Sequence, residues 1–467
     1  MPDIQSADGV RFETHASVVI VGAGAAGLVA ALSAKAAGAD PIVIERDAIP
    51  AGSTALSAGL IPAAGTRFQR QQGIDDSVAQ FRADILAKAD GHSDPAVLDA
   101  ATQAIGPALE WLADAHGLPF DVIADFRYPG HSAFRMHALP SRSGAELINR
   151  LRAAAESAGI TIATAARVTT LYAAAGAKIT GVAVQRPDGR NERLGCDALV
   201  LACNGYGGNT AMVARHIPEL IGALWFGHSG NEGDAVLWGE ALGADIKHMS
   251  GYQGHGSVAT PHGILITWAT ITEGGFQVNR LGQRFSNEAK GYSEQGAIVL
   301  RQPERVAWTI FDTRIAAIAR QFEDFRNAEA QGAILIAPTI EALAGMAGLP
   351  ATALTATFAE VEAAKAARAT DAFGRAFADV APLAPPFAVV KVTGALFHTQ
   401  GGLAIDRDAR GLRPNGSSLP NLFAAGGAAV GVSGPDASGY LSGNGLLTAV
   451  ALGRVAGHAA ARLAAAR

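Results

Sequence analysis

The sequence predicts an α/β fold in which one sheet-containing domain is split by an inserted domain, and three observations predict it. A strand, a glycine-rich turn and an apolar helix follow one another near the N-terminus, from Ser17 to Ala34. A second strand that runs into glycines lies far down the chain, at Asn421–Gly426, and a long helix follows it. Between them, from about Tyr252, polar clusters, aromatic residues and an alanine-rich helix indicate an α+β insertion.

The N-terminal segment carries a glycine signature between its strand and its helix. After the strand Ser17–Val21 the chain reads Gly22-Ala23-Gly24-Ala25-Ala26-Gly27. Gly22 allows a tight turn, Gly24 lets the backbone approach a pyrophosphate, and Gly27 lets helix and strand pack closely. The helix N-terminus offers N–H groups and a positive dipole end to phosphates.

A second strand, Pro41–Ile44, ends on Glu45 and completes a βαβ unit at about residues 16–46. An acid about 20 residues after the glycines is placed to accept a hydrogen bond from an adenosine ribose hydroxyl. A Rossmann-type dinucleotide-binding domain is therefore the prediction, and a glycine-rich turn without a ligand is the alternative.

Periodicity and turn residues predict the remaining elements. Helices are expected near 76–90, 95–115, 144–158 and 351–370, and from Gly443-Asn444-Gly445 to the C-terminus; strands are expected at 161–164, 167–172, 178–185 and 197–202, with a turn at Asp188-Gly189. A proline-rich hinge, 382–386, returns the chain to strands. The expected organisation is a first domain part at 1–250, an inserted capping domain at 251–384 and a second domain part at 385–467.

Composition narrows the class of protein. The chain has 467 residues, of which 49% are apolar and 17% charged, as expected for a large buried core. A net charge of −5 without a basic patch argues against nucleic acid as a partner. Cys196 and Cys203 lack the spacing of metal ligands or of a disulfide framework, so we expect no metal and a reducing cytoplasm.

Three further sequence patterns are absent. The apolar stretch 16–34 contains the glycine signature, so we expect no membrane span there, and residues 1–15 show no signal-peptide pattern. Haem attachment through Cys-x-x-Cys-His is also excluded, because the sequence lacks that motif.

The distribution of the nucleotide signals favours FAD over a nicotinamide cofactor. An early βαβ unit and a late strand–glycine–helix segment suggest one nucleotide domain split by the insertion. The N-terminus of the last helix would then face the flavin pyrimidine ring and stabilise negative charge on reduced flavin. A nicotinamide dehydrogenase would usually need only the first unit.

Motifs over nearly the whole chain resemble the flavoprotein superfamily of fumarate reductase and succinate dehydrogenase, whose relatives include tricarballylate dehydrogenase and 3-ketosteroid dehydrogenases. The matching segments are Gly22–Gly27, Gly52-Ser53-Thr54, Ala58-Gly59, Leu201–Gly205, Asn279–Glu288, His398–Gly402, Gly439–Gly445 and Leu452–Gly457. The resemblance implies FAD. It implies non-covalent FAD, because Ser53–Ser57 contains no attachment histidine. Gly427 replaces a glutamate that fumarate reductases carry after Ala-Gly.

The resemblance also implies an active site for hydride transfer at flavin N5. His255 and His398 match the two substrate histidines of the family. Tyr292 falls where fumarate reductases place an arginine acid, and Tyr440 falls where they place a carboxylate-binding arginine. We expect the inserted domain to cover the flavin, carry His255 and Tyr292 to the substrate, and exclude water on closure.

The proton-relay glutamate and arginine of fumarate reductases are missing near Trp268 and Ile271. Two arginines suit a dicarboxylate, whereas two tyrosines suit a neutral carbonyl. The main prediction is therefore Cα–Cβ dehydrogenation, or the reverse ene reduction, next to a ketone or acyl carbonyl, with an unidentified electron donor or acceptor.

Two alternatives stay open. One is a fumarate-reductase-like or tricarballylate-dehydrogenase-like enzyme on a carboxylic acid, with Arg135 or Arg142 of the basic cluster 127–142 as the carboxylate partner. The other is a non-redox FAD-binding protein.

The residues expected to bind the cofactor come from every matching segment of the split domain. They are Gly22, Ala23, Gly24, Ala25, Ala26, Gly27, Glu45, Arg46, Gly52, Ser53, Thr54, Ser57, Ala58, Gly59, Val168, Ala202, Gly205, Gly426, Gly443, Asn444, Gly445, Leu446 and Leu447. Arg284 is expected to be structural, paired with Glu288 or a neighbour.

Overall fold

A computed structural model describes residues 3–124 and 126–466 and divides the chain into two compact units. The first unit comprises 1–217, 227–252 and 398–467, and the second comprises 218–226 and 253–397. The fold is mixed α/β, as the sequence predicts. Each unit has its own hydrophobic core.

A nine-stranded sheet organises the first unit, with the strand order β1-β8-β9-β10-β2-β3-β7; β21 also pairs with β10, and β20 pairs with β21. Its strands are β1 (Asp3–Ser6), β2 (Thr14–Val21), β3 (Pro41–Ile44), β7 (Thr161–Ala163), β8 (Arg167–Ala174), β9 (Lys178–Gln185), β10 (Asn191–Leu201), β20 (Arg410–Leu412) and β21 (Ser418–Ala424). β2 pairs in parallel with both β3 and β10, and β21 pairs in parallel with β10. The early and late segments of the sequence therefore share one sheet.

Helices and short strands surround this sheet. They are α1 (Ala25–Ala36), α2 (Gly52–Ala55), α3 (Arg67–Gln71), α4 (Val78–Lys88), α5 (Pro95–His116), α6 (Gly144–Ser157), α7 (Thr210–His216), α8 (Asp234–Ala241) and α15 (Asn444–Ala465), with β4 (Ile61–Pro62), β5 (Asp121–Val122), β6 (Met136–Ala138), β12 (Ile246–Lys247) and β19 (Gly402–Leu403). No helix of the described residues has the length and apolar character that crossing a membrane needs.

The second unit is built on a seven-stranded sheet with the order β14-β13-β18-β16-β15, to which β11 and β17 add at β18. Its elements are β11 (Leu224–Trp225), β14 (Ile264–Leu265), α9 (Ala269–Thr272), β15 (Phe276–Val278), α10 (Tyr292–Leu300), β16 (Val306–Asp312), α11 (Thr313–Ala319), α12 (Glu323–Ala330), β17 (Ile334–Ala337), α13 (Ile340–Ala347) and α14 (Ala351–Ala366). The strands β13 (Tyr252–Ala259) and β18 (Phe387–Thr399) begin or end in the first unit.

The inserted domain ends later in the chain than the proline-rich segment 382–386 predicts. The sequence places the end of the insertion at residue 384, whereas the compact second unit continues to Phe397. The reason is that β18 starts at Phe387 and pairs antiparallel with β16 from Asp312↔Phe387 to Val306↔Thr393. The strand after the prolines is thus a central strand of the second unit.

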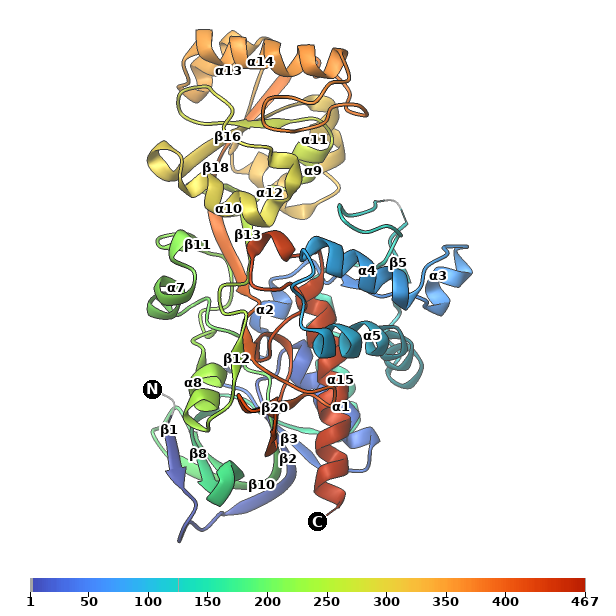
Figure 1. Ribbon diagram of the computed structural model, residues 1–467, viewed down its shortest axis with the longest axis vertical. Coiled ribbons are helices and arrows are strands. Elements are labelled where there is room, and N and C mark those ends of the chain that lie inside the picture. The colour runs from blue at the N-terminus through green and yellow to red at the C-terminus, as the bar shows by residue number, and fades with distance from the viewer. Residues whose placement is uncertain (1–2, 125, 467) are drawn as a thin grey trace. The chain divides into compact units, whose positions relative to one another are not determined.

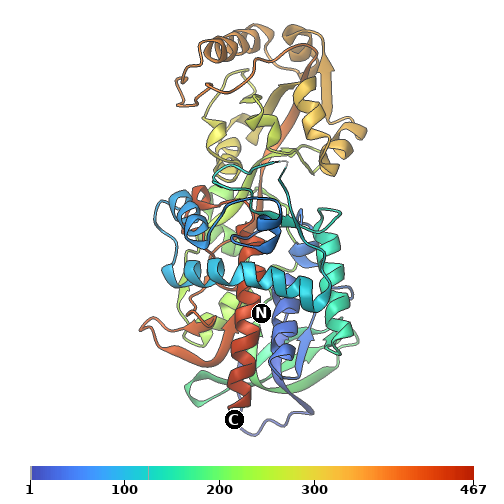
Figure 2. The same cartoon turned by 90° about the vertical axis from the view of Figure 1, so that its right-hand side faces the viewer.

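In the first unit, α15 runs beside α1, and both views show the two helices next to each other (Figures 1 and 2). Small residues make the contact possible: a Cβ built at Gly453 would lie 2.6 Å from the Ala26 carbonyl oxygen, and one at Gly457 would lie 2.0 Å from that of Ala30. The Ser33 hydroxyl donates to the Arg454 carbonyl at 2.7 Å. The packing of α1 on α15 therefore depends on the absence of side chains.

We expect Gly457→Ala to lower the free energy of unfolding of the first unit by about 1–3 kcal/mol, because the new methyl group overpacks the helix contact. Alanine otherwise favours a helix over glycine by about 1 kcal/mol. Gly345→Ala in α13 is the matched control, since a Cβ there meets no described atom within 4 Å. Calorimetry should show a lowered unfolding temperature for Gly457→Ala and an unchanged or raised unfolding temperature for Gly345→Ala. Equal shifts in the two variants would contradict the close packing.

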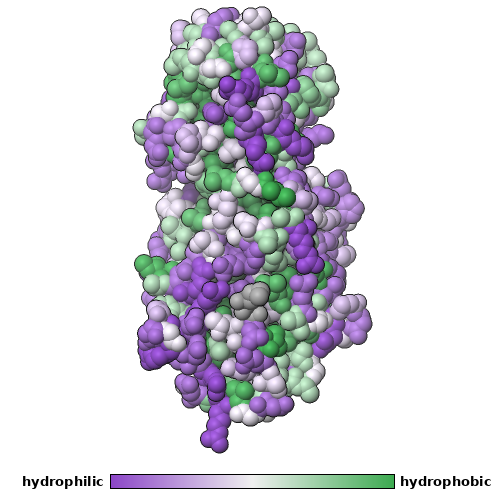
Figure 3. Space-filling view, turned by 90° about the vertical axis from the view of Figure 1, so that its left-hand side faces the viewer, coloured by the Kyte–Doolittle hydropathy of each residue, from purple (hydrophilic) through white to green (hydrophobic). Residues whose placement is uncertain are grey.

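On the face seen in Figure 3, hydrophilic residues are distributed from one end to the other, with hydrophobic residues interspersed.

Candidate active site

The glycine turn between β2 and α1 has the shape of a phosphate site. Gly22 has a φ of +102°, and a Cβ there would lie 2.6 Å from the Ala202 carbonyl oxygen at the end of β10. A Cβ at Gly27 would lie 1.8 Å from the Gly22 carbonyl oxygen. α1 begins without a side-chain cap and without an acid in its first turn. A helix N-terminus of this kind suits an anionic group.

Two side chains already bind amides of this turn. The Ala23 N–H donates to Glu45 Oε2 at 2.7 Å, and the Ala25 N–H donates to the Thr54 hydroxyl at 3.0 Å. Glu45 Oε1 also accepts from the Asp47 N–H at 2.9 Å. The structure thus places Glu45 beside the glycine turn, as the βαβ motif predicts; its contact with a ribose stays a prediction.

Residues from distant segments meet around α2. The Ser53 hydroxyl accepts from the Asn204 side chain at 3.1 Å and from the Asn231 side chain at 2.9 Å. All the residues that the sequence predicts to bind the cofactor belong to the first unit. The split domain therefore brings the early, middle and late motifs into one compact body.

The first residue of α15 carries a buried polar atom that makes no hydrogen bond within the described residues. The Asn444 side chain donates to the Ser433 hydroxyl at 2.9 Å, whereas its Oδ1 is buried and has no hydrogen-bond partner among the described residues. Buried polar atoms in proteins are nearly always hydrogen-bonded. Together with the glycine turn, this atom fits a bound dinucleotide with hydrogen-bonding ring atoms, as the predicted FAD has.

Tyr440 and His398, two of the four predicted active-site residues, lie beside each other. Their ring centroids lie 5.4 Å apart in an edge-to-face arrangement. Burial raises the pKa of Tyr440 above its ordinary value, and hydrogen bonds from the Gly445 and Gly443 amides partly offset this effect. The phenol therefore stays protonated at neutral pH and can donate a hydrogen bond.

His398 is neutral at physiological pH, because burial lowers its pKa to about 4. Its Nδ1 contacts the Gln400 amide nitrogen at 3.1 Å, and the Ser433 hydroxyl donates to Gln400 Oε1 at 2.7 Å. A Cβ at Gly445 would lie 2.7 Å from His398 Nε2, so the helix start lies directly beside the imidazole ring.

His255 and Tyr292 form the other pair, in the second unit. Their rings stack with centroids 4.9 Å apart and an interplanar angle of 23°. His255 lies on β13, and Tyr292 is the first residue of α10. The Ser293 hydroxyl accepts from the Gly254 N–H at 3.0 Å and so ties these two elements together. The structure thus brings together two side chains that lie far apart in the sequence.

Other aromatic rings complete the surroundings of His255. The ring centroid of Trp268 lies 5.5 Å from that of His255, with the rings edge to face, and the centroid of Phe397 lies 5.4 Å from it, with the rings tilted. The Phe226 ring stacks on Phe397 with centroids 4.6 Å apart. His255 is 5% exposed, and burial lowers its pKa to about 3. Trp268 and Ile271 are buried apolar residues at the positions where the sequence shows the relay residues to be missing. The cluster is neutral and mainly aromatic.

Phe226 and Phe397 belong to the aromatic cluster around His255, and the sequence motifs alone do not predict them. Phe397 directly precedes His398 in the His-Thr-x-Gly-Gly motif, so its place in the chain is a usable signal. Phe226 has no local signal, because its contact with Phe397 depends on the pairing of β11 with β18.

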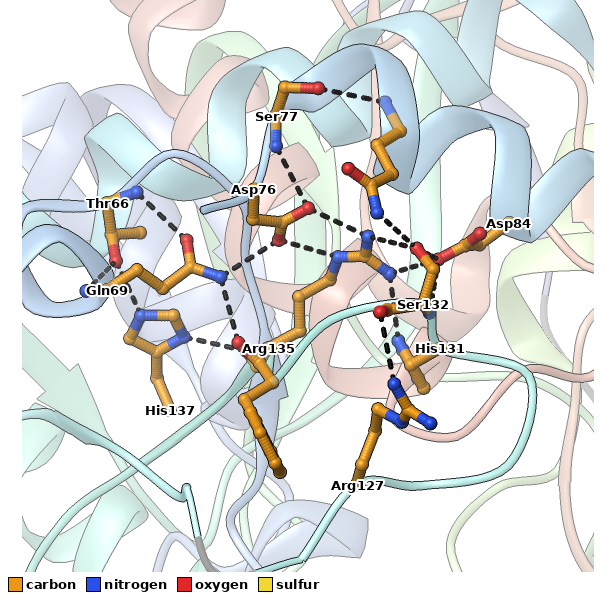
Figure 4. Close-up of polar contacts among 12 residues, drawn as sticks. Thr66, Gln69, Asp76, Ser77, Asp84, Arg127, His131, Ser132, Arg135 and His137 are labelled. Carbon is orange, nitrogen blue, oxygen red and sulfur yellow. Dashed lines mark hydrogen bonds and ion pairs between the residues drawn. The ribbon is translucent and has the colours of Figure 1, made fainter. Parts of the chain in front are cut away.

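Arg135 lies in a buried polar network rather than at an open anion site (Figure 4). Its guanidinium donates to both carboxylate oxygens of Asp76 at 2.8 Å, to Asp84, and to the Ser132 hydroxyl at 3.2 Å, and its side chain is 0% exposed. The structure does not support Arg135 as the carboxylate partner of a substrate, because its own acids occupy it. Arg142 is exposed.

Arg284 is structural, as the sequence predicts. It pairs with Glu288 at 2.7 Å and with Asp371, and Arg375 approaches Glu288 at 3.1 Å. Arg375 also donates to the carbonyl oxygens of Ile271 and Gly275. This buried cluster fixes the segment that leads to Tyr292.

Three histidines with lowered pKa values predict that acid destabilises the first unit. Burial lowers the pKa of His131, His137 and His398 to about 4 each, against about 6.5 in the unfolded chain. Between these values the unfolded chain binds more protons, so stability rises with pH and is lost as the pH falls from about 6.5 towards 4.

We therefore expect the calorimetric transition of the first unit to fall steeply between pH 7 and pH 4.5. For each histidine, the free energy of unfolding falls by up to about 1.4 kcal/mol for every pH unit within this window. In the control variant His137→Gln the slope should be shallower, because one of the three protonation sites is removed. A transition temperature that stays constant over this range would contradict the neutral state of these rings in the folded protein.

Comparisons with known proteins agree with this geometry. A family described as "FAD binding domain" matches residues 17–446, which is most of the chain. The chain is 30% identical over 449 residues to a probable fumarate reductase, Ifc3, of Shewanella frigidimarina, covering 95% of this chain and 74% of that one. It is 27% identical to a urocanate reductase of Eggerthella lenta, covering 97% of this chain and 75% of that one.

Solved structures show the same fold. The open conformation of a flavocytochrome c3 fumarate reductase superposes with a TM-score of 0.82 and 29% identity, covering 97% of this chain and 79% of that one. A 3-ketosteroid-Δ4-(5α)-dehydrogenase from Rhodococcus jostii RHA1 superposes with a TM-score of 0.77 and 26% identity, covering 99% of this chain and 100% of that one. With its glycine turn, its split sheet and these matches, the chain belongs to the FAD-binding fumarate reductase/succinate dehydrogenase flavoprotein superfamily and is an FAD-dependent oxidoreductase that acts on CH–CH groups.

Proposed function

We propose that the protein reduces the carbon–carbon double bond of an α,β-unsaturated acid that carries a single carboxylate. The observation that carries this proposal is the lack of charge at three of the four matched positions. His255 and His398 are neutral because burial lowers the pKa of each, and Tyr440 stays protonated. A dicarboxylate needs two cations, whereas one carboxylate can accept hydrogen bonds from a phenol and a neutral imidazole.

Each residue has one role in this proposal. Tyr440 and His398 hold the carbonyl or carboxylate oxygen, and His255 orients the substrate. Tyr292 gives a proton to the carbon next to the carbonyl, while hydride reaches the neighbouring carbon. FAD supplies the hydride chemistry when it is bound. A phenol with a reference pKa of about 10 is a better proton donor than base at neutral pH, which favours the direction of reduction.

The names of the relatives include acids with one carboxylate and acids with two. Urocanate, the substrate in the name of one relative, carries a single carboxylate, whereas fumarate carries two. An unsaturated ketone is the second candidate. The edge-to-face pair of Tyr440 and His398 presents a phenol donor that suits a ketone oxygen, and a ketosteroid dehydrogenase shares the fold at 26% identity. The electron donor is proposed to be a separate protein or domain.

One matched series of oxidants tests the proposal. The holoenzyme is reduced anaerobically and mixed with cinnamate, with benzalacetone, its methyl ketone counterpart, or with fumarate, and the return of oxidised flavin absorbance is followed. We expect cinnamate to reoxidise the flavin at least about tenfold faster than fumarate. Faster reoxidation by benzalacetone would favour the ketone candidate, and faster reoxidation by fumarate would contradict both. No reoxidation by any compound would favour a non-redox role.

We also propose that the FAD is held without a covalent bond. The segment 53–57 beside the glycine turn contains no histidine that could form one. Acid precipitation should therefore release all of the flavin into the supernatant as FAD. Yellow colour that stays in the washed pellet would contradict non-covalent binding, and FMN in the supernatant would contradict the cofactor itself. A heat-denatured sample provides the control for incomplete unfolding.

A further inference from the structure

His131 links the buried Arg135 network to the segment that carries Tyr440. Arg135 Nη1 approaches His131 Nδ1 at 3.3 Å, and His131 Nε2 contacts the Ser442 carbonyl oxygen at 3.0 Å. Figure 4 shows the imidazole ring beside the guanidinium. His131 is 5% exposed, so water does not compete strongly for either nitrogen.

The two partners fix the tautomer of His131. A guanidinium can only donate, so Nδ1 must be the accepting, unprotonated nitrogen. The ring proton then lies on Nε2, where it donates to the Ser442 carbonyl. Asp76 and Asp84 hold the Arg135 side chain, and the centroid of the Phe81 ring lies 4.8 Å from its guanidinium carbon. The direction of the hydrogen bond to Ser442 is therefore built into the network.

The Ser442 carbonyl belongs to the same peptide group as the Gly443 N–H. This N–H lies near the Tyr440 phenol and offsets part of the rise in the pKa of that phenol that burial causes. Because a peptide group is planar and rigid, a contact that holds its carbonyl also orients its N–H. A single peptide plane thus connects His131 on one side with the Tyr440 phenol on the other.

A second contact holds the same segment. Gly130 has a φ of +87°, and a Cβ there would lie 2.7 Å from Leu441 Cδ1. The turn at 130–131 therefore packs against two successive residues after Tyr440, through the Leu441 side chain and the Ser442 carbonyl.

We propose that His131 is a positioning residue that fixes the Ser442–Gly443 peptide and, through it, the phenol of Tyr440. This inference rests on the proposed function, in which Tyr440 holds the substrate oxygen. His131 itself touches neither substrate nor cofactor in this proposal. The nearby Arg135 acts one step further back, by holding the His131 ring in its donating tautomer.

The first test measures amide hydrogen exchange in the holoenzyme, in the peptide that covers residues 440–446. His131→Leu should speed exchange there about tenfold, as expected for the loss of one hydrogen bond that holds the segment closed. His131→Gln should restore slow exchange, because its amide N–H can still donate to the carbonyl. The peptide 147–157 of α6 is the internal control. Unchanged exchange at 440–446, or an equal increase in both peptides, would overturn the proposal.

The second test asks whether His131 acts through Tyr440. Dissociation constants of cinnamate and benzalacetone are measured on the oxidised holoenzyme from the perturbation of the flavin spectrum. His131→Leu and Tyr440→Phe should each weaken binding by about tenfold. The double variant should bind no more weakly than Tyr440→Phe within about twofold, because the two residues share one contact. If the double variant weakened binding by the product of the two single effects, the link between His131 and Tyr440 would be overturned. If the wild-type enzyme bound neither compound, the proposed function would fail, and hydrogen exchange alone would decide the role of His131.

Discussion

Tyr292→Phe should lower the rate of substrate-dependent flavin reoxidation by about 10²–10⁴, the usual cost of removing a positioned acid or base. The substitution removes only the hydroxyl, so the stacking of the ring on His255 at 4.9 Å should persist. FAD content should stay the same, and the dissociation constant of cinnamate should change little. Stopped-flow absorbance separates the chemical step from binding and from product release.

Tyr172→Phe is the matched control, because it removes a phenol hydroxyl from a buried ring on β8 that packs against Phe12 at 5.7 Å. Its turnover should equal that of the wild type. If Tyr292→Phe stays fully active while Arg142→Ala loses activity, the proton-transfer role of the tyrosine is refuted. An arginine-dependent carboxylate mechanism would then take its place.

Arg135→Met should lower the free energy of unfolding of the first unit by about 3–5 kcal/mol, the usual cost of breaking a buried ion pair from one side. The variant leaves Asp76, whose side chain is 0% exposed, without its bidentate partner, and leaves Asp84, at 15%, without its cation. Urea unfolding followed by far-UV circular dichroism measures the loss.

Arg150→Met provides the comparison, since it removes a half-exposed helical ion pair with Glu146 and should cost no more than about 0.5 kcal/mol. Adding Asp76→Asn to Arg135→Met should recover part of the loss, because it removes one unpaired charge. Equal stability of the two arginine variants would show that the buried network contributes little.

The first βαβ unit could be predicted from the sequence because each of its parts is determined locally. Only glycine fits position 22, where φ is positive and a Cβ would lie 2.6 Å from a carbonyl oxygen, so the turn is visible in the sequence as a glycine. β3 and β9 have the expected bounds, since β-branched runs end there at turn residues. β10 begins at Asn191 rather than at 197, because its first half pairs with β9 in a hairpin.

The role of Arg135 could not be predicted, because its partners are distant in the sequence. Asp76 and Asp84 precede it by 59 and 51 residues, whereas its own loop contains several basic residues and looks like a solvated surface. His131 is hidden in the same way, since its Ser442 contact spans 311 residues. His255 and His398 could be found because they lie in recognisable motifs. Long-range polar contacts leave no periodic signal of this kind.

The contact between α1 and α15 has a consequence for synthesis of the protein on the ribosome. The hydrogen bond from Ser33 to Arg454 cannot form until Arg454 emerges, 421 residues later. At about 5–20 residues per second, this delay amounts to roughly 20–80 s. During that time the face of α1 that packs on α15 has no partner, whereas residues 253–397 of the second unit all emerge before Arg454 does. The nascent first unit is therefore a natural client for chaperones that shield exposed apolar segments until translation ends.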